Sequence, residues 1–233
     1  MRSFTTRTVV GLAAGILLLS GCGGSSESDS GKPSTPREEM LLSESEFPEG
    51  SKVQPITAAD LQAKSDEQAK LLETAEIDPA ECMSSEKDIA GATKDLLNEA
   101  SVIAAFAEST LYFEAIIDRE QDLSKLAAAT TDPCAETTQK FVTEGKSVVV
   151  VNSNEELELP DDLQGDNVLA YGSSTKTSIG EGEPIVGGSY HGFANVRGVT
   201  VLVNAVNISE GTPDAQAFID LFAAAVRKVE DAK

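Results

Sequence analysis

The sequence predicts an α+β domain in which helices pack on an antiparallel sheet of about five or six strands, and a C-terminal helix closes the core. Short runs in the second half predict strands at 147–151, 167–171, 192–196 and 199–206, and the first of them holds four valines. Arg197-Gly198 separates the last two runs, which predicts a two-residue hairpin turn. The C-terminal residues instead repeat their apolar side chains with the period of a helix.

The C-terminal helix carries the clearest signals. Thr212 is the predicted N-cap, Pro213 the first helical residue, and Asp214 lies in the first turn, where its charge complements the helix dipole. One continuous apolar face follows, formed by Phe218, Leu221, Phe222, Ala225, Val226 and Val229. We expect this face to pack on the sheet.

The first half predicts shorter elements. In chain order they are a turn at 47–50, a strand at 53–56, a helix at 57–74 with Thr57 as its N-cap, a helix at 86–97, and short helices at 122–129 and 133–141. Residues 102–106 and 111–117 fit either two strands or one buried helix, and we favour strands. The glycine-rich residues 180–192 predict a surface loop between strands, with the lip of a binding cleft as the alternative.

The N-terminus has the pattern of a lipoprotein signal peptide. Arg2 and Arg7 precede an apolar run at 9–19, which is too short to span a bilayer, and Leu18-Leu19-Ser20-Gly21-Cys22 follows. This resembles the lipobox of bacterial lipoproteins, whose cysteine receives diacylglycerol and palmitate. We therefore expect a signal peptide at 1–21, a flexible Ser/Gly/Pro tether at 22–39 and one extracytoplasmic domain at 40–233, held on the cell membrane by Cys22.

Charge and cysteine content limit the classes of binding partner and predict how the cysteines are used. The net charge is −21, and −23 after residues 1–21 and their two arginines are removed, which argues against nucleic-acid binding. With Cys22 lipidated, Cys82 and Cys134 remain as an even pair in an oxidising compartment and predict a disulfide, with two buried thiols as the alternative. No metal site is expected, and the acidic residues 161–166 lack the ligand spacing of an EF-hand.

Catalytic and cofactor motifs are not recognised. Gly188-Ser189-Tyr190-His191 suggests a nucleophile elbow, but His191 stands where that motif needs glycine. We expect Ser189 and His191 to point to different faces of a strand and to form no dyad. The sequence has no P-loop or dinucleotide fingerprint, so no cofactor is expected, and the ligand-binding residues stay unknown.

Several short motifs occur in a characteristic order. After the lipobox come Leu41-Leu42, Phe47-Pro48-Glu49-Gly50, Asp78-Pro79-Ala80-Glu81-Cys82, Asp132-Pro133-Cys134, and Arg197-Gly198-Val199-Thr200-Val201 before the last helix. This order resembles actinobacterial lipoproteins related to the extracellular sensor domain of PknH-type receptor kinases, and similar uncharacterised mycobacterial-type lipoproteins. The resemblance implies an antiparallel sheet with flanking helices and a cleft for an unknown ligand. The kinase domains carry two disulfides, whereas this chain can form one.

The expected function is therefore that of a non-enzymatic, lipid-anchored envelope protein. Its domain would bind an unknown small ligand or an envelope protein in the manner of a sensor. The alternative is a carrier of lipid or of another apolar envelope molecule, which requires a large apolar cavity. A hydrolase that uses Ser189 is the third hypothesis.

Overall fold

The computed structural model describes residues 31–84, 87, 100–143, 145–165 and 167–233. Its helices are α1 (Arg37–Met40), α2 (Ala58–Thr74), α4 (Leu123–Thr130) and α5 (Ala215–Glu230), with 3-10 turns η1 (Glu44–Glu46) and η2 (Asp161–Leu163). Its strands are β1 (Lys52–Gln54), β2 (Glu76–Asp78), β3 (Ala100–Ala107), β4 (Thr110–Ile117), β5 (Glu136–Thr143), β6 (Lys146–Glu156), β7 (Val168–Ile179), β8 (Ile185–Val196) and β9 (Val199–Asn207).

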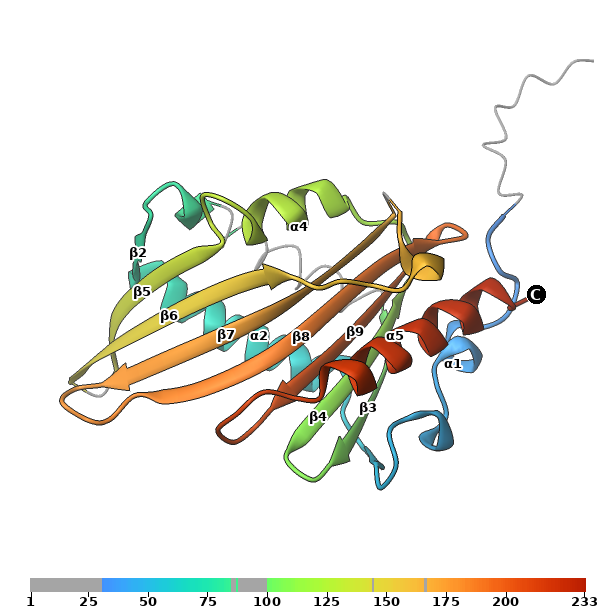
Figure 1. Cartoon of the computed structure of the whole chain (residues 1–233), viewed down its shortest axis with the longest axis horizontal. Coiled ribbons are helices and arrows are strands. Elements are labelled where there is room, and N and C mark those ends of the chain that lie inside the picture. Colours follow the sequence, from blue (N-terminus) through green and yellow to red (C-terminus); the bar gives the residue numbers. More distant parts are fainter. Residues whose placement is uncertain (1–30, 85–86, 88–99, 144, 166) are drawn as a thin grey trace, which may run out of the picture. The chain divides into compact units, whose positions relative to one another are not determined.

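The strands form one antiparallel sheet in the order β1-β3-β4-β9-β8-β7-β6-β5-β2 (Figure 1). The α+β class with an antiparallel sheet is confirmed, but the expected five or six strands were too few, because nine are present. β1 and β2 are edge strands of three residues, too short to show a clear alternation of apolar and polar side chains. The predicted helix at 133–141 is wrong, since its residues from Glu136 onward pair with β6 as β5.

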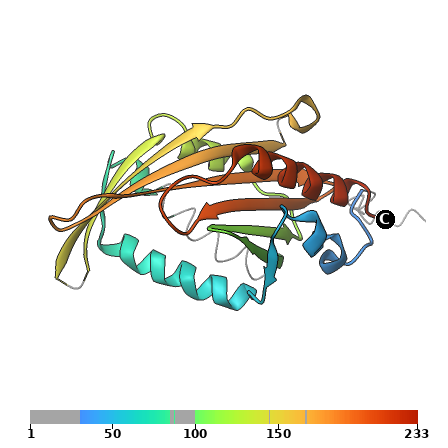
Figure 2. The same cartoon turned by 60° about the horizontal axis from the view of Figure 1, so that its bottom comes forward.

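Helix α5 packs on one face of the sheet, which we call the α5 face (Figures 1 and 2). The predicted apolar positions are all buried: Phe218, Leu221, Phe222, Ala225, Val226 and Val229. They join Val199, Val201, Val203 and Ala205 of β9 in the main core. Each buried valine, leucine or phenylalanine among them stabilises the fold by about 1.5–3 kcal/mol. The helix begins later than predicted, because Asp214, not Thr212, is the N-cap and accepts a bond from Ala217 N at 2.7 Å.

Close packing of α5 depends on a glycine in β8. A Cβ atom at Gly192 would lie 3.0 Å from the ring of Phe222 and 3.1 Å from that of Phe218. The strand can therefore approach the helix only where it lacks a side chain. At the other end of β8, Arg197 and Gly198 have φ angles of 50° and 79°, which confirms the predicted two-residue hairpin turn to β9.

The opposite side of the sheet, the second face, lies toward α2 (Figure 2). Thr57 caps α2 as predicted, and its hydroxyl and the Asp60 carboxylate form a capping box. The helix ends beside a small core made of Leu72, Ala75, Ile77 and the disulfide between Cys82 and Cys134. The S–S distance is 2.01 Å, so the predicted bridge is confirmed.

The remaining predictions for the first half are resolved as follows. Residues 100–117 form the β3–β4 hairpin, which confirms strands over a helix. The predicted helix at 122–129 is α4, one residue later at each end. The predicted helix at 86–97 lies outside the described residues apart from residue 87.

Residues 31–39 were expected to belong to the tether. The structure instead places the described part of this stretch on the domain, where Lys32 pairs with Asp118 at 2.5 Å and Thr35 N donates to Lys233 O at 3.1 Å. Residues from Gly31 onward belong to the compact unit, which begins before the expected start at 40.

Candidate functional site

The second face of the sheet carries almost no charge. The pairing register places only two charged positions of β3–β9 on it, Lys146 and Glu156, and both are at strand ends. Between them the face alternates apolar side chains with serine, threonine, asparagine and histidine. In a chain of net charge −21, this neutrality distinguishes the second face from the outer surface.

Three polar side chains on the second face form a continuous hydrogen-bond chain. Ser189 Oγ lies 2.8 Å from His191 Nε2, and His191 Nδ1 lies 3.0 Å from Asn204 Oδ1. The expectation that Ser189 and His191 point to different faces is wrong. They are two residues apart on β8, so their side chains share a face, and His191 is directly opposite Asn204 of β9.

The imidazole of His191 is held neutral. Burial lowers its pKa below the ordinary value, and the hydrogen bond to Asn204 opposes this shift only in part. A neutral ring donates from one nitrogen and accepts at the other. Nδ1–H donates to Asn204, which leaves Nε2 to accept the hydroxyl proton of Ser189. Tyr171 of β7 stacks on the ring with centroids 4.9 Å apart, so the imidazole is fixed on its flat side as well.

Further neutral groups continue this array across β7 and β6. Ser173 is directly opposite Ser189, and two residues on Thr175 Oγ1 donates to Asn152 Oδ1 at 2.9 Å. We call these neutral polar residues of β6–β9 the polar stripe, and it consists of Asn152, Ser173, Thr175, Ser189, His191 and Asn204. All six residues are half-buried, so their polar atoms are partly available to a ligand.

The chemistry of the polar stripe favours recognition. It offers hydroxyl, amide and imidazole groups in fixed directions beside the Tyr171 ring, which suits an uncharged, hydrogen-bonding molecule. The Ser189–His191–Asn204 order is also that of a nucleophile, base and orienting group. Ser189 lies within a regular strand between β7 and β9, however, and not on a turn that would project its Oγ.

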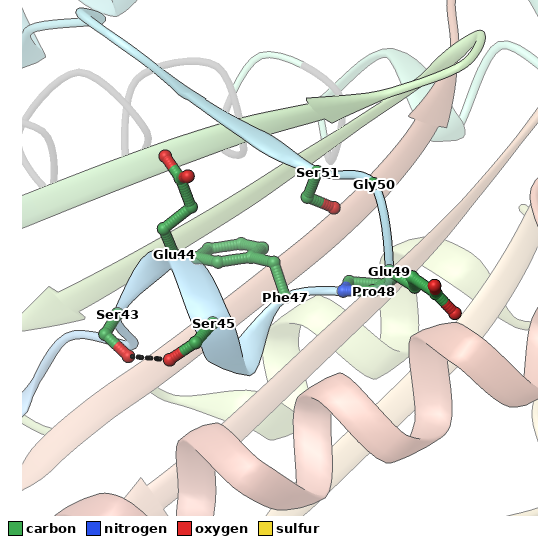
Figure 3. Close-up of a pocket in the computed structure, with 8 residues that line it drawn as sticks. All are labelled: Ser43, Glu44, Ser45, Phe47, Pro48, Glu49, Gly50 and Ser51. Carbon is green, nitrogen blue, oxygen red and sulfur yellow. Dashed lines mark hydrogen bonds between the residues drawn. The ribbon is translucent and has the colours of Figure 1, made fainter.

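A pocket with a volume of about 500 Å³ lies in the N-terminal segment (Figure 3). It is lined by one loop, residues 43–51, whose Phe47 is buried in the main core. The hydroxyl of Ser51 is buried and has no hydrogen-bond partner among the described residues. Because a single loop supplies the whole lining, this pocket offers few groups from different directions.

The other residues named from the sequence have structural positions. Cys22 lies outside the described residues, and Cys82 and Cys134 hold the small core. In the acidic turn, Asp162 pairs with Arg227 at 2.6 Å. Across the described ranges, no group of three or more His, Cys, Asp or Glu side chains is placed to hold a metal ion. The glycine-rich residues 180–192 form the β7–β8 turn and most of β8, not a long loop.

Sequence reasoning missed Asn152, Tyr171, Ser173, Thr175 and Asn204. These residues come from three other strands and meet Ser189 and His191 only through the register of the sheet. The alternation of neutral polar side chains along 171–177 and 187–191 is the local signal that could have indicated a polar face.

The geometry defines an antiparallel α+β domain with an apolar face under α5 and a second face that carries the neutral polar stripe. No family model matches the chain, and no curated protein matches it. Two solved structures are similar. One is an uncharacterised protein, an Rv0999 ortholog, from Mycobacterium smegmatis, with 18% identity over 84% of this chain and 98% of that one, and a TM-score of 0.43. The other is the extracellular domain of PknH from Mycobacterium tuberculosis, with 13% identity over 85% and 98% of the chains, and a TM-score of 0.38.

These neighbours match the resemblance to PknH-type sensor domains and mycobacterial-type proteins that the sequence motifs indicated. Among the helices of the described ranges, none combines the length and the apolar content needed to cross a bilayer.

Proposed function

We propose that this chain is a non-enzymatic, lipid-anchored protein of the cell envelope whose domain binds a small uncharged ligand at the polar stripe. The neutrality of the stripe carries the proposal. In a strongly acidic chain, a half-buried row of hydroxyl, amide and imidazole groups without a carboxylate supports a binding role better than a solubility role.

The ligand class follows from the same groups. An anion would be repelled by the net charge of −21, and a cation would find no carboxylate among the six side chains of the stripe. A neutral molecule with hydroxyl or amide groups can replace the water on these atoms without an ionic desolvation cost. A flat apolar edge on such a molecule would complement Tyr171.

The single histidine of the chain provides a direct test of the ligand. Maltose, lactose, myo-inositol and a neutral dipeptide amide are titrated against full-length protein, while the imidazole resonances of His191 are followed by NMR. We expect saturable shifts with at least one neutral probe, and none with glucuronate.

Matched variants locate the response. Ser173→Ala should weaken it by about fivefold, since one hydrogen bond contributes about 1 kcal/mol. Ser174→Ala, one residue away and exposed on the other side of the strand, should leave it unchanged. Tighter binding of glucuronate than of the neutral probes, or a panel that leaves the His191 signals unmoved, contradicts the proposal.

The anchor is tested separately. Cys22→Ser should move the protein from the membrane to the soluble fraction and abolish incorporation of a labelled fatty acid, because two or more acyl chains are needed for stable attachment. Ser20→Ala, which keeps a small residue before Cys22, serves as the control. A Cys22→Ser protein that stays with the membrane excludes lipid anchoring at this cysteine.

A further inference from the structure

The sheet has a partly apolar notch beside the first residues of β8. Pairing between β8 and β9 stops at Ser189 and Val206, and the β7–β8 hairpin projects beyond the end of β9 (Figure 1). Past this point Gly187 forms a parallel bridge with Gly211, whose N donates to Val186 O at 3.2 Å. A pocket of about 490 Å³ occupies this notch, and we call it the tip pocket. Its lining consists of Thr175, Thr177, Ile185, Gly187, Asn207, Ile208, Ser209 and Glu210.

Apolar side chains around the tip pocket are exposed to solvent. Ile208 is 64% exposed and Ile185 is 52% exposed, although both line the pocket. Ile179 and Val206, which the register places on the same sheet face as Ile185, are 44% and 36% exposed. Four branched apolar side chains at one end of a small domain form a surface that a partner can cover.

The charges beside the tip pocket determine which partner fits. Glu210 lines the pocket, and Glu181 and Glu183 lie on the adjoining β7–β8 turn, all three exposed. Two such surfaces would repel each other, and so would an anionic bilayer. A partner with lysine or arginine beside an apolar side chain complements both the charge and the pocket.

The tip pocket lies at the far end of β8 from the first described residue, Gly31. Arg197, which follows the last residue of β8, donates from Nε to Gly31 O at 2.9 Å, so Gly31 lies at this end of the strand. The tip pocket lies at the first residues of β8, a strand of 12 residues or roughly 40 Å.

We propose that the tip pocket is the docking site for a basic segment of another envelope protein, which inserts one large apolar side chain between Ile185 and Ile208 and places flanking lysine or arginine side chains against Glu210 and the Glu181–Glu183 turn. This site differs from the polar stripe, although Thr175 belongs to both.

A random 12-residue peptide library displayed on phage tests the proposal, with full-length protein in detergent as bait. We expect the selected peptides to share a large apolar residue flanked by lysine or arginine. By fluorescence anisotropy, Ile208→Ser and Glu210→Lys should each weaken binding of the selected peptides at least tenfold, and raised salt should weaken it further.

Val142→Ser is the matched control. Val142 is 69% exposed on another hairpin, so its substitution removes a similar apolar area and should leave binding unchanged. Each substituted side chain is exposed, and unchanged melting temperatures verify the fold. Failure to enrich any peptide, enrichment of acidic or uncharged peptides, or equal losses in Val142→Ser and Ile208→Ser overturns the proposal. So does a dimer in sedimentation that Ile208→Ser dissociates, because the occupant is then a second copy.

Discussion

The two faces of the sheet differ in the side chains that they present and in how deeply these are buried. On the α5 face, valines of β9 meet two phenylalanines of α5, and most of these side chains are fully buried. On the second face, the central strands present half-buried neutral polar groups that bond to one another. The small core around the disulfide stabilises this side near β2 and β5. The first arrangement stabilises the fold, and the second keeps hydrogen-bonding groups available.

Two titratable groups, Glu114 on the α5 face and His191 on the second face, respond to pH in opposite directions. Glu114 of β4 lies on the α5 face with no exposed surface, and its Oε2 accepts a bond from Leu42 N at 2.8 Å. Burial raises its pKa to about 7. Burial lowers the pKa of His191 on the second face. In both cases the protein favours the uncharged form.

The largest expected effect is on the α5 face. Phe222→Asp should abolish cooperative folding, because it places a carboxylate where Phe218, Gly192 and β9 leave no water. The measurement is thermal unfolding by circular dichroism. Gln216→Asp, exposed on the same helix, should change stability by less than about 0.5 kcal/mol. A folded Phe222→Asp protein with a normal melting temperature would show that the α5 face is not the main core.

Loss of the disulfide should be the next largest effect. The bridge joins residues 52 positions apart, for which the chain-entropy model gives about 4 kcal/mol. Cys82→Ala/Cys134→Ala should lower the free energy of unfolding by about this amount. Reductant should lower the free energy of unfolding of the parent protein but leave that of the double variant unchanged. By hydrogen exchange, amides of β2 and β5 should lose protection while those of α5 keep it. Equal loss on both faces would contradict their separation.

The α5 face was the more predictable of the two. Its helix repeats apolar residues from Phe218 to Val229, and its hairpin turn has a glycine at the position that needs a positive φ, so local patterns were enough. The disulfide was predicted because two cysteines remain once Cys22 is assigned to lipidation and because the expected compartment is oxidising. Only the N-cap differed, because Thr212 and Asp214 both suit that position and the tertiary structure selects between them.

The second face was largely hidden from sequence reasoning. β5 is mostly polar, with residues such as Thr137 and Gln139 where a strand with one buried face would have apolar side chains. Its sequence therefore lacks the alternation of a strand, and a helix was predicted instead. Ser189 and His191 were treated as neighbours on the strand, whose side chains would point to opposite faces. They are two residues apart, so their side chains point to the same face. Asn204 joins them through pairing between β8 and β9, which no local pattern specifies.

Glu114 should make stability depend on pH between about 4.5 and 7. Its folded pKa lies above its unfolded value, so its favourable contribution is complete below pH 4.5 and lost as pH rises through about 7. The shift corresponds to about 3 kcal/mol. Glu114→Gln should therefore raise stability at pH 8 and flatten the profile in urea unfolding. Glu76→Gln, exposed on β2, is the control. An unchanged profile in Glu114→Gln would assign the pH dependence to other groups.

His191 should contribute the smaller dependence of opposite sign. Its folded pKa is lowered, so its contribution is present above pH 6.5 and lost as pH falls through the folded value. The bond to Asn204 raises that pKa, so Asn204→Ala should lower it further and cost about 1 kcal/mol of stability. NMR titration of the only histidine measures the shift, with the exposed Asn167→Ala as control. A raised or unchanged His191 pKa in Asn204→Ala would mean that Asn204 does not hydrogen-bond to the imidazole, and the polar stripe would then lack the ordered hydrogen-bond chain that distinguishes the second face from the α5 face.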